Sequence, residues 1–195
     1  MSRQVTLKRE TRETRIELSL ELDGRGESTL ETGLPFLDHM LEALARHARL
    51  DLRLTCEGDL EVDDHHTVED CALVLGAALD QALGERRGIT RFGSAYAPLD
   101  ESLARAVVDL SGRPFAFVEL GLRRERLGTV ACENLTHFFI SLATAARLTL
   151  HLELLRGEND HHRAEAAFKA LALALRQALA LEGEGDAVPS TKGVL

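Results

Sequence analysis

The order of apolar and polar positions along the chain predicts strands and helices in a regular succession. Alternation of apolar and polar residues, as in Arg15–Leu22, is typical of a strand with one buried face. Apolar residues three or four positions apart, as in Pro35–Ala48, predict an amphipathic helix, and proline suits its first turn. In the first half we expect strands at Val5–Leu7, Arg15–Leu22, Ser28–Thr32 and Leu50–Thr55, and helices at Pro35–Ala48 and Asp64–Leu83.

The second half repeats this order of elements. We expect strands at Ser94–Pro98, Leu103–Leu110, Phe115–Leu120 and Leu148–Leu154, and helices at Asn134–Arg147 and Asp160–Leu181. Each half therefore reads βββαβα, an α+β unit in which two helices cover a four-stranded sheet. We place the halves at residues 1–90 and 91–182 and a polar, glycine-containing tail at 183–195. No linker separates the halves, which predicts one compact unit.

A repeated motif supports the duplication. Asp64–Glu69 and Asp160–Glu165 share the pattern D-H-H-x-x-E, 96 positions apart. An upstream histidine accompanies each copy, His39 in the first half and His137 in the second, 98 positions apart. Matched landmarks at nearly one offset indicate two tandem copies of about 95 residues.

These motifs carry the side chains of a metal site. Residues i and i+4 share a helix face, so His65 lies beside Glu69, and His161 beside Glu165. Adjacent histidines diverge by about 100°, so the two members of a pair can serve different metals. The candidate ligands allow two sites of about three histidines and one glutamate each, and we expect one cluster from each copy. The eight candidates are His39, His65, His66, Glu69, His137, His161, His162 and Glu165.

The donor types indicate which metal to expect. Imidazoles and carboxylates without thiolates, and with open coordination positions, fit manganese or iron better than zinc. The alternative is that these are ordinary polar helix starts, with Asp64 and Asp160 as N-caps. An isolated His-His pair is more often without function, but two copies with matching glutamates and upstream histidines favour the metal site.

Composition and charge argue against nucleic-acid-binding, membrane and secreted proteins. The net charge of −9 and the lack of a basic stripe argue against nucleic-acid binding. No apolar run approaches the ~20 residues of a membrane span, and the polar Met1–Arg15 segment predicts no secretory leader. Three cysteines without C-x-x-C spacing predict buried free thiols in a reducing compartment, hence a cytoplasmic protein.

Longer strings make the chain resemble a known family over essentially its whole length. They are Leu34–Leu41, Asp63–Asp70, Arg91–Gly93, Ser111–Pro114, Glu158–Lys169 and Pro189–Gly193. In these strings the sequence resembles the imidazoleglycerol-phosphate dehydratases. The resemblance implies a duplicated fold of the ribosomal protein S5 domain 2-like type and a homo-oligomer of 24 subunits. It also implies two Mn²⁺ ions per subunit at subunit interfaces, held by the eight histidines and glutamates named above.

The same resemblance assigns the substrate contacts. It places Glu13, Arg91, Arg113, Ser190 and Lys192 against a small phosphate substrate, which forked arginine donors suit. Taken alone, the S-T-K-G tail more often indicates a disordered end, whereas the resemblance implies that it orders over the substrate. The implied reaction is the dehydration of imidazole glycerol phosphate to imidazole acetol phosphate in histidine biosynthesis.

The chemistry of this reaction is demanding because no carbonyl acidifies the carbon that loses its hydrogen. We expect two metals on the two ring nitrogens to stabilise an imidazolate, which can expel the adjacent hydroxyl. Glu13 is the first candidate for the proton shuttle, with Glu69 or Glu165 as the alternative. Three other functions stay open: a metal-dependent hydrolase, a metal-bridged assembly without catalysis and, from the S5-like fold alone, nucleic-acid binding.

Overall fold

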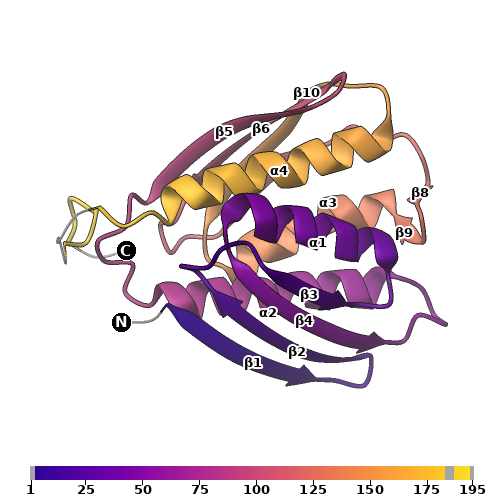
Figure 1. Ribbon diagram of the computed structural model, residues 1–195, viewed down its shortest axis with the longest axis horizontal. Helices are drawn as coiled ribbons and strands as arrows, with labels where there is room; N and C mark the ends of the chain where they lie inside the picture. The colour runs from indigo at the N-terminus through magenta and orange to yellow at the C-terminus, as the bar shows by residue number, and fades with distance from the viewer. Residues whose placement is uncertain (1–2, 183–186, 194–195) are drawn as a thin grey trace.

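The computed structural model contains two four-stranded sheets with four helices between them (Figure 1). It describes residues 3–182 and 187–193. The first half contains β1 (Gln4–Glu10), β2 (Thr14–Glu21), β3 (Ser28–Glu31), α1 (Pro35–Ala48), β4 (Asp51–Gly58) and α2 (His65–Leu83). The second half contains β5 (Phe92–Leu99), β6 (Ser102–Asp109), β7 (Phe115–Glu119), β8 (Arg126–Leu127), β9 (Val130–Ala131), α3 (Cys132–Ala145), β10 (Thr149–Arg156) and α4 (Asp160–Ala178).

The two sheets have the same topology. Their strand orders are β1-β2-β4-β3 and β5-β6-β10-β7, and in each the third strand of the half pairs in parallel with the fourth. The other pairs are antiparallel. The predicted α+β fold with duplicated βββαβα halves is therefore confirmed.

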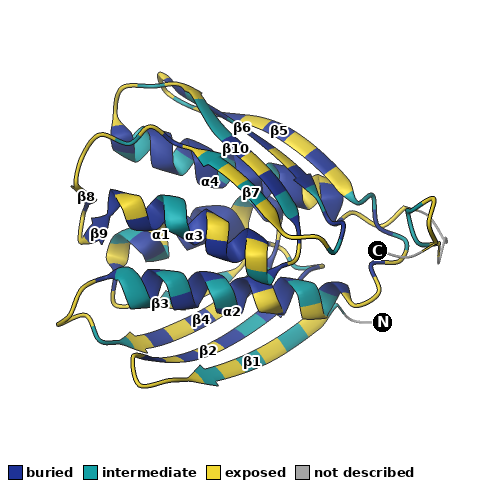
Figure 2. Cartoon of the chain, turned by 180° about the vertical axis from the view of Figure 1, so that it is seen from behind, coloured by how far each residue is buried: buried dark blue, intermediate teal, exposed yellow. Residues whose placement is uncertain are grey.

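The burial pattern explains why these segments form strands and helices. Along β2 and β6 every second residue is buried against helices while the intervening residues face outward (Figure 2). The helices α1 and α4 lie against each other, and so do α2 and α3, so each contact joins one half to the other. All three cysteines are free and buried, as the sequence predicts.

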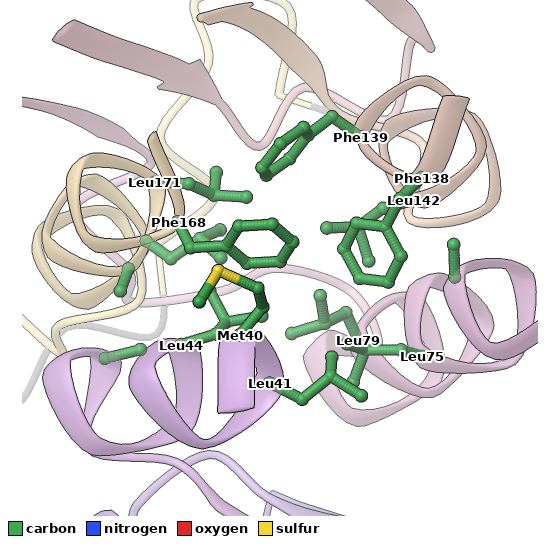
Figure 3. Packing of buried hydrophobic residues seen from close by; sticks show 14 of the residues in the cluster. Met40, Leu41, Leu44, Leu75, Leu79, Phe138, Phe139, Leu142, Phe168 and Leu171 are labelled. Carbon is green, nitrogen blue, oxygen red and sulfur yellow. The ribbon is translucent and has the colours of Figure 1, made fainter. Parts of the chain in front are cut away.

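Aromatic side chains fill the centre between the helix pairs. Phe168 of α4 lies 5.3 Å from Phe138 and 4.5 Å from Phe139, both of α3, measured between ring centroids. Met40 of α1 packs beside Phe168, and all four side chains are fully buried (Figure 3). The core therefore belongs to both halves at once, which makes the duplicated unit a single packed body.

Most predicted bounds differ from the structure by one to three residues, as at α3, which spans Cys132–Ala145 rather than Asn134–Arg147. The final helix ends at Ala178 rather than Leu181, because residues 88–91 pair with the chain beyond it: Arg91 N–H donates to Ala178 O and Thr90 N–H to Ala180 O. The short β8–β9 hairpin was not predicted, since two-residue strands leave no periodic pattern. Residues 183–186 and 194–195 of the predicted tail lie outside the described residues.

Replacement of the central aromatic ring tests how far the core depends on it. Phe168→Ala should lower the free energy of unfolding by about 3–5 kcal/mol, because a buried ring is lost and leaves a cavity. Denaturant unfolding at equal subunit concentration measures this. Leu155→Ala, whose side chain is exposed, is the control and should change stability by no more than about 0.5 kcal/mol. Equal losses in the two variants would contradict a core centred on Phe168.

Candidate metal and substrate sites

The first pair of helices gathers one group of metal-ligand types. His39 of α1 and His161 and Glu165 of α4 offer ligand atoms that all lie within 4.8 Å of one another. The Nε2 atoms of His39 and His161 lie 3.4 and 3.3 Å from the same oxygen, Oε2 of Glu165. We call this group cluster A.

The second pair of helices gathers the matching group. His65 and Glu69 of α2 and His137 of α3 also place their ligand atoms within 4.8 Å of one another. His137 Nε2 lies 3.0 Å from Glu69 Oε1, and His65 Nε2 lies 3.7 Å from Glu69 Oε2. We call this group cluster B.

Both clusters combine the two halves of the chain. Cluster A takes His39 from the first half and the other two residues from the second, and cluster B takes His137 from the second half. The expectation that each copy supplies its own cluster is therefore wrong. The reason is tertiary: the helices that carry the motifs pair across the halves rather than within them.

Hydrogen bonds orient His65, the candidate ligand that begins α2. Asn134 donates its amide N–H to Asp64 Oδ2 at 2.9 Å, which turns its carbonyl oxygen toward His65 Nδ1 at 3.0 Å. Nδ1 therefore carries the proton, and Nε2 is free to accept or to ligate. Asp64 also accepts the N–H of Ala131, so this carboxylate binds across the halves instead of capping its own helix.

Asp160, in the matching position, has the matching role. It accepts the backbone N–H groups of Arg123 and Arg124, while Asn159 caps α4 through its side chain. The alternative interpretation of Asp64 and Asp160 as simple N-caps is therefore wrong. Both buried carboxylates instead hold the helix ends that carry the candidate ligands against the segment between β7 and α3.

The second histidine of each pair points away from its cluster. His66 Nδ1 donates to the Asp59 carboxylate, 3.0 Å from Oδ2, and its Nε2 lies 3.6 Å from Glu13 Oε1. His162 Nδ1 donates to Glu101 Oε2 at 2.7 Å. These hydrogen bonds are the main cause that raises the pKa of His66 and of His162.

The two glutamates of the clusters differ in their surroundings. Lys169 donates to Glu165 Oε1 at 2.7 Å, one turn along α4. Burial acts to raise the pKa of Glu165, but the Lys169 hydrogen bond and charge, together with His39, outweigh it and lower that pKa. The position one turn beyond Glu69 holds Leu73, so cluster B has no such cation from its own helix.

The phosphate-binding candidates form a separate group. Arg91 donates through Nε and Nη2 to both oxygens of Asp109, at 2.7 and 3.1 Å, and through Nη1 to Pro189 O in the tail. Arg113 Nη2 lies 3.7 Å from the same carboxylate. Ser190 and Lys192 belong to this tail segment, where Lys192 N–H donates to Ser190 Oγ.

This group lies at the opposite end of the folded subunit from clusters A and B. Arg91 is bonded to Ala178 at the C-terminal end of α4, whereas Glu165 is in its first turns (Figure 1). The helix rise of 1.5 Å per residue puts about 20 Å between these two positions. Within one chain, the two clusters therefore lie far from the candidate phosphate-binding residues. Glu13, between β1 and β2, lies at the cluster end beside His66.

Comparisons with known proteins agree over nearly the whole length. A sequence model described as imidazoleglycerol-phosphate dehydratase matches residues 32–175. The chain belongs to the imidazoleglycerol-phosphate dehydratase family. The Candida glabrata enzyme of that name is 56% identical over 97% of this chain and 98% of its own, and the Saccharomyces cerevisiae enzyme is 51% identical over 97% and 96%.

Solved structures of imidazoleglycerol-phosphate dehydratases share the fold. The Pyrococcus furiosus structure has a TM-score of 0.83 at 40% identity and covers 97% of this chain and 100% of its own. The Staphylococcus aureus structure has a TM-score of 0.83 at 38% identity, covering 91% and 99%. The resemblance stated from the sequence is thus confirmed, and this imidazoleglycerol-phosphate dehydratase is a lyase of histidine biosynthesis. None of the helices in the described part of the chain is long and apolar enough to cross a bilayer.

Sequence reasoning missed two carboxylates at the dehydratase's site. Asp59 and Glu101 hold the second histidine of each pair, and neither belongs to a repeated motif. A signal for Glu101 was present, since it precedes β6 as Glu13 precedes β2. Asp59 carries no comparable signal, because it lies in the irregular segment between β4 and α2.

The environment of Glu165 predicts that Lys169 contributes to the free energy of unfolding in a pH-dependent way. In metal-free protein at pH 7, Lys169→Met should lower the free energy of unfolding by about 1–3 kcal/mol, because a largely buried carboxylate loses a charged donor. The lowered pKa of Glu165 makes this contribution complete above the ordinary value of 4.5. It is lost as the pH falls through the folded-state pKa, so the two proteins should converge in acid.

Unfolding in denaturant across this pH range measures the difference. Lys8→Met is the control, because the Lys8–Glu17 pair is exposed and should contribute well under about 1 kcal/mol. A Lys169→Met deficit that does not change with pH would show that the lysine acts by packing alone.

Proposed function

We propose that this enzyme converts imidazole glycerol phosphate to imidazole acetol phosphate and water with two Mn²⁺ ions per subunit. The observation that carries the proposal is the pair of matched clusters A and B in a chain of this family. When bound, the ions supply positive charge to both nitrogens of the substrate's imidazole and so stabilise an imidazolate.

The donor set fits such an ion. Each cluster directs two imidazole Nε2 atoms around one carboxylate, without thiolates, which suits manganese and does not demand the closed tetrahedron of structural zinc. Three ligands leave positions open for a further histidine and for substrate. An arrangement with free positions supports catalysis over a purely structural metal bridge.

We assign the fourth protein ligand of each site to a neighbouring subunit. His66 and His162 are the two predicted ligands that lie outside the clusters, and their side chains are 30% and 27% exposed. Both are therefore suited to complete the cluster of another copy. A homo-oligomer with metals at its interfaces, the 24-subunit assembly of our expectation, satisfies this requirement.

The position of the candidate phosphate-binding residues supports the same assembly. The four candidate phosphate-binding residues lie at the end of the folded subunit opposite the clusters; they are Arg91, Arg113, Ser190 and Lys192. One small substrate is too short to contact these residues and a cluster of the same subunit. We assign these four residues to the substrate phosphate of a site whose metals belong to a neighbour. Asp109 fixes Arg91 by two hydrogen bonds and leaves further guanidinium N–H groups for the phosphate.

Glu13 is the carboxylate that we assign to proton transfer at the substrate carbon. Its side chain is 52% exposed and lies beside His66, where a ring held by metals would be placed. Glu69 and Glu165, the alternative candidates, each face two imidazoles of their own cluster, and Glu165 also accepts from Lys169. These two carboxylates are committed to ligation, which leaves Glu13 to take up the proton from the C–H group and return it during ketone formation.

Removal of the metal tests the proposal directly. A chelator should abolish dehydration and reduce the particle mass, because both the chemistry and the interfaces use the ions, and added Mn²⁺ should restore both. Formation of the ketone product and light scattering measure the two effects. Activity that survives thorough metal removal would refute the metal-dependent mechanism, and release of inorganic phosphate in place of water would indicate a hydrolase.

Substitution of the proposed proton shuttle separates chemistry from binding. Glu13→Gln should lower kcat by about 10²–10⁴-fold, the usual contribution of a positioned acid or base, with little change in KM and in bound manganese. Steady-state kinetics and metal analysis measure these quantities. Glu57→Gln is the matched control because that carboxylate is 82% exposed on β4, and its activity should stay at the wild-type level. A Glu13→Gln enzyme with unchanged kcat would exclude the assignment.

A further inference from the structure

The second histidine of each D-H-H motif is held at the same ring atom in both halves. His66 Nδ1 lies 3.2 and 3.0 Å from the two carboxylate oxygens of Asp59. His162 Nδ1 lies 2.7 Å from Glu101 Oε2. A carboxylate only accepts hydrogen bonds, so each ring in its neutral form carries its proton on Nδ1 and has the lone pair on Nε2.

The two carboxylates are not equivalents of each other in the duplication. Asp59 follows β4, whereas Glu101 precedes β6, where the first half has Glu13. Glu13 faces Nε2 of its histidine, not Nδ1. The residue that matches Asp59 in the second half is Glu158, which follows Gly157 as Asp59 follows Gly58, and its backbone N–H donates to Glu101. The same contact is thus made from two different segments, which indicates that the contact itself is required.

The other ring nitrogen, Nε2, has similar surroundings in both halves. Nε2 of His66 lies 3.6 Å from Glu13, and Nε2 of His162 lies 3.9 Å from Asp100, both distances beyond a hydrogen bond. The two histidine side chains are 30% and 27% exposed. Each imidazole is therefore fixed from behind while its basic nitrogen faces the surface.

We propose that Asp59 and Glu101 are positioning residues that hold His66 and His162 in the Nδ1–H tautomer, so that Nε2 is presented to the metal cluster of a neighbouring subunit. This inference rests on the proposed function, because it needs the two histidines to be ligands. It adds the residues that make them competent as ligands, since an imidazole protonated at Nε2 cannot bind a metal there.

The same arrangement separates the roles of two equivalent glutamates. Glu101 accepts the N–H groups of Glu158 and Asn159 at 3.1 and 2.9 Å as well as that of His162. These donors, the Asn159 N–H first, hold the Glu101 carboxyl in its charged form and lower its pKa. Glu13 is free of this duty because Asp59 performs it in the first half. The duplication has thus kept one glutamate for positioning and left its counterpart available for proton transfer.

The decisive variant is Glu101→Gln. Its amide oxygen can keep the two backbone N–H bonds, but its amide N–H₂ then faces His162 Nδ1 and favours the opposite tautomer, with the proton on Nε2. We expect Mn²⁺ affinity to fall by about 10- to 100-fold at one of the two sites per subunit. Asp59→Asn should be milder, because either orientation of the amide brings an atom near His66 Nδ1, and Asp59→Ala should cause the full loss.

Titration with Mn²⁺ alone, by calorimetry or by the electron paramagnetic resonance of the free ion, measures the affinity of the intact protein. Light scattering reports the assembly, and the unfolding of metal-free protein shows whether each variant is folded. Glu158→Gln and Glu61→Ala are the controls, since both side chains are exposed beside the altered residues, and both should bind like wild type.

Comparison with His162→Ala separates this inference from the proposed function. If His162→Ala loses Mn²⁺ affinity and Glu101→Gln and Asp59→Ala do not, the positioning role is wrong and the metal assignment stands. If His162→Ala and His66→Ala both bind Mn²⁺ like wild type, the assignment of these ligands fails and the inference fails with it. Loss in all four variants, with the graded effect of Asp59→Asn, is the expected result.

Discussion

The pairing of helices across the two halves is the constraint on which the candidate site depends. Because α1 lies on α4 and α2 on α3, the ends that carry the histidine motifs meet in pairs, and each cluster combines residues from both copies. Neither half contains a complete cluster. The aromatic packing of Phe138, Phe139 and Phe168 holds these helices at fixed distances, so the core positions the donors as well as stabilising the fold.

Buried carboxylates connect that packing to the site. Asp64 directly precedes α2 and Asp160 begins α4, yet both direct their oxygens to backbone N–H groups of the segment between β7 and α3. Through Asn134, Asp64 also sets the tautomer of His65. The motif D-H-H-x-x-E thus contains one residue that anchors the helix end, one histidine that points into its cluster, one that points away from it and one carboxylate between imidazoles.

The sequence was sufficient to predict the strands, the helices and the types of candidate ligand residues. It was insufficient to predict which of these residues contact one another. Period-two and helical patterns located every long strand and helix, because each has one face on the core, and α1 has the predicted bounds. The end of α4 was missed because the apolar pattern continues to Leu181 while the chain turns to pair with residues 88–91. The grouping of His39 with His161 was missed as well, because spacing reports only what one helix can bring together. The contacts of Asp59 and Glu101 likewise depend on tertiary structure.

The departures from symmetry follow from what the proposed reaction requires. An imidazole with one side chain is not symmetric, so two identical metal sites would accept the ring in either orientation, and only one orientation brings the C–H group to a base. The duplicated scaffold differs between its halves at two places near the clusters. Lys169 lies beside Glu165 in cluster A, whereas Leu73 takes the matching position in α2, so α4 supplies a cation to its cluster and α2 supplies none at that position. Glu13 and Glu101 occupy the same place in the two halves, but three donors restrain only Glu101. Under the proposed function, a single substrate orientation with its reacting carbon toward Glu13 is consistent with both differences.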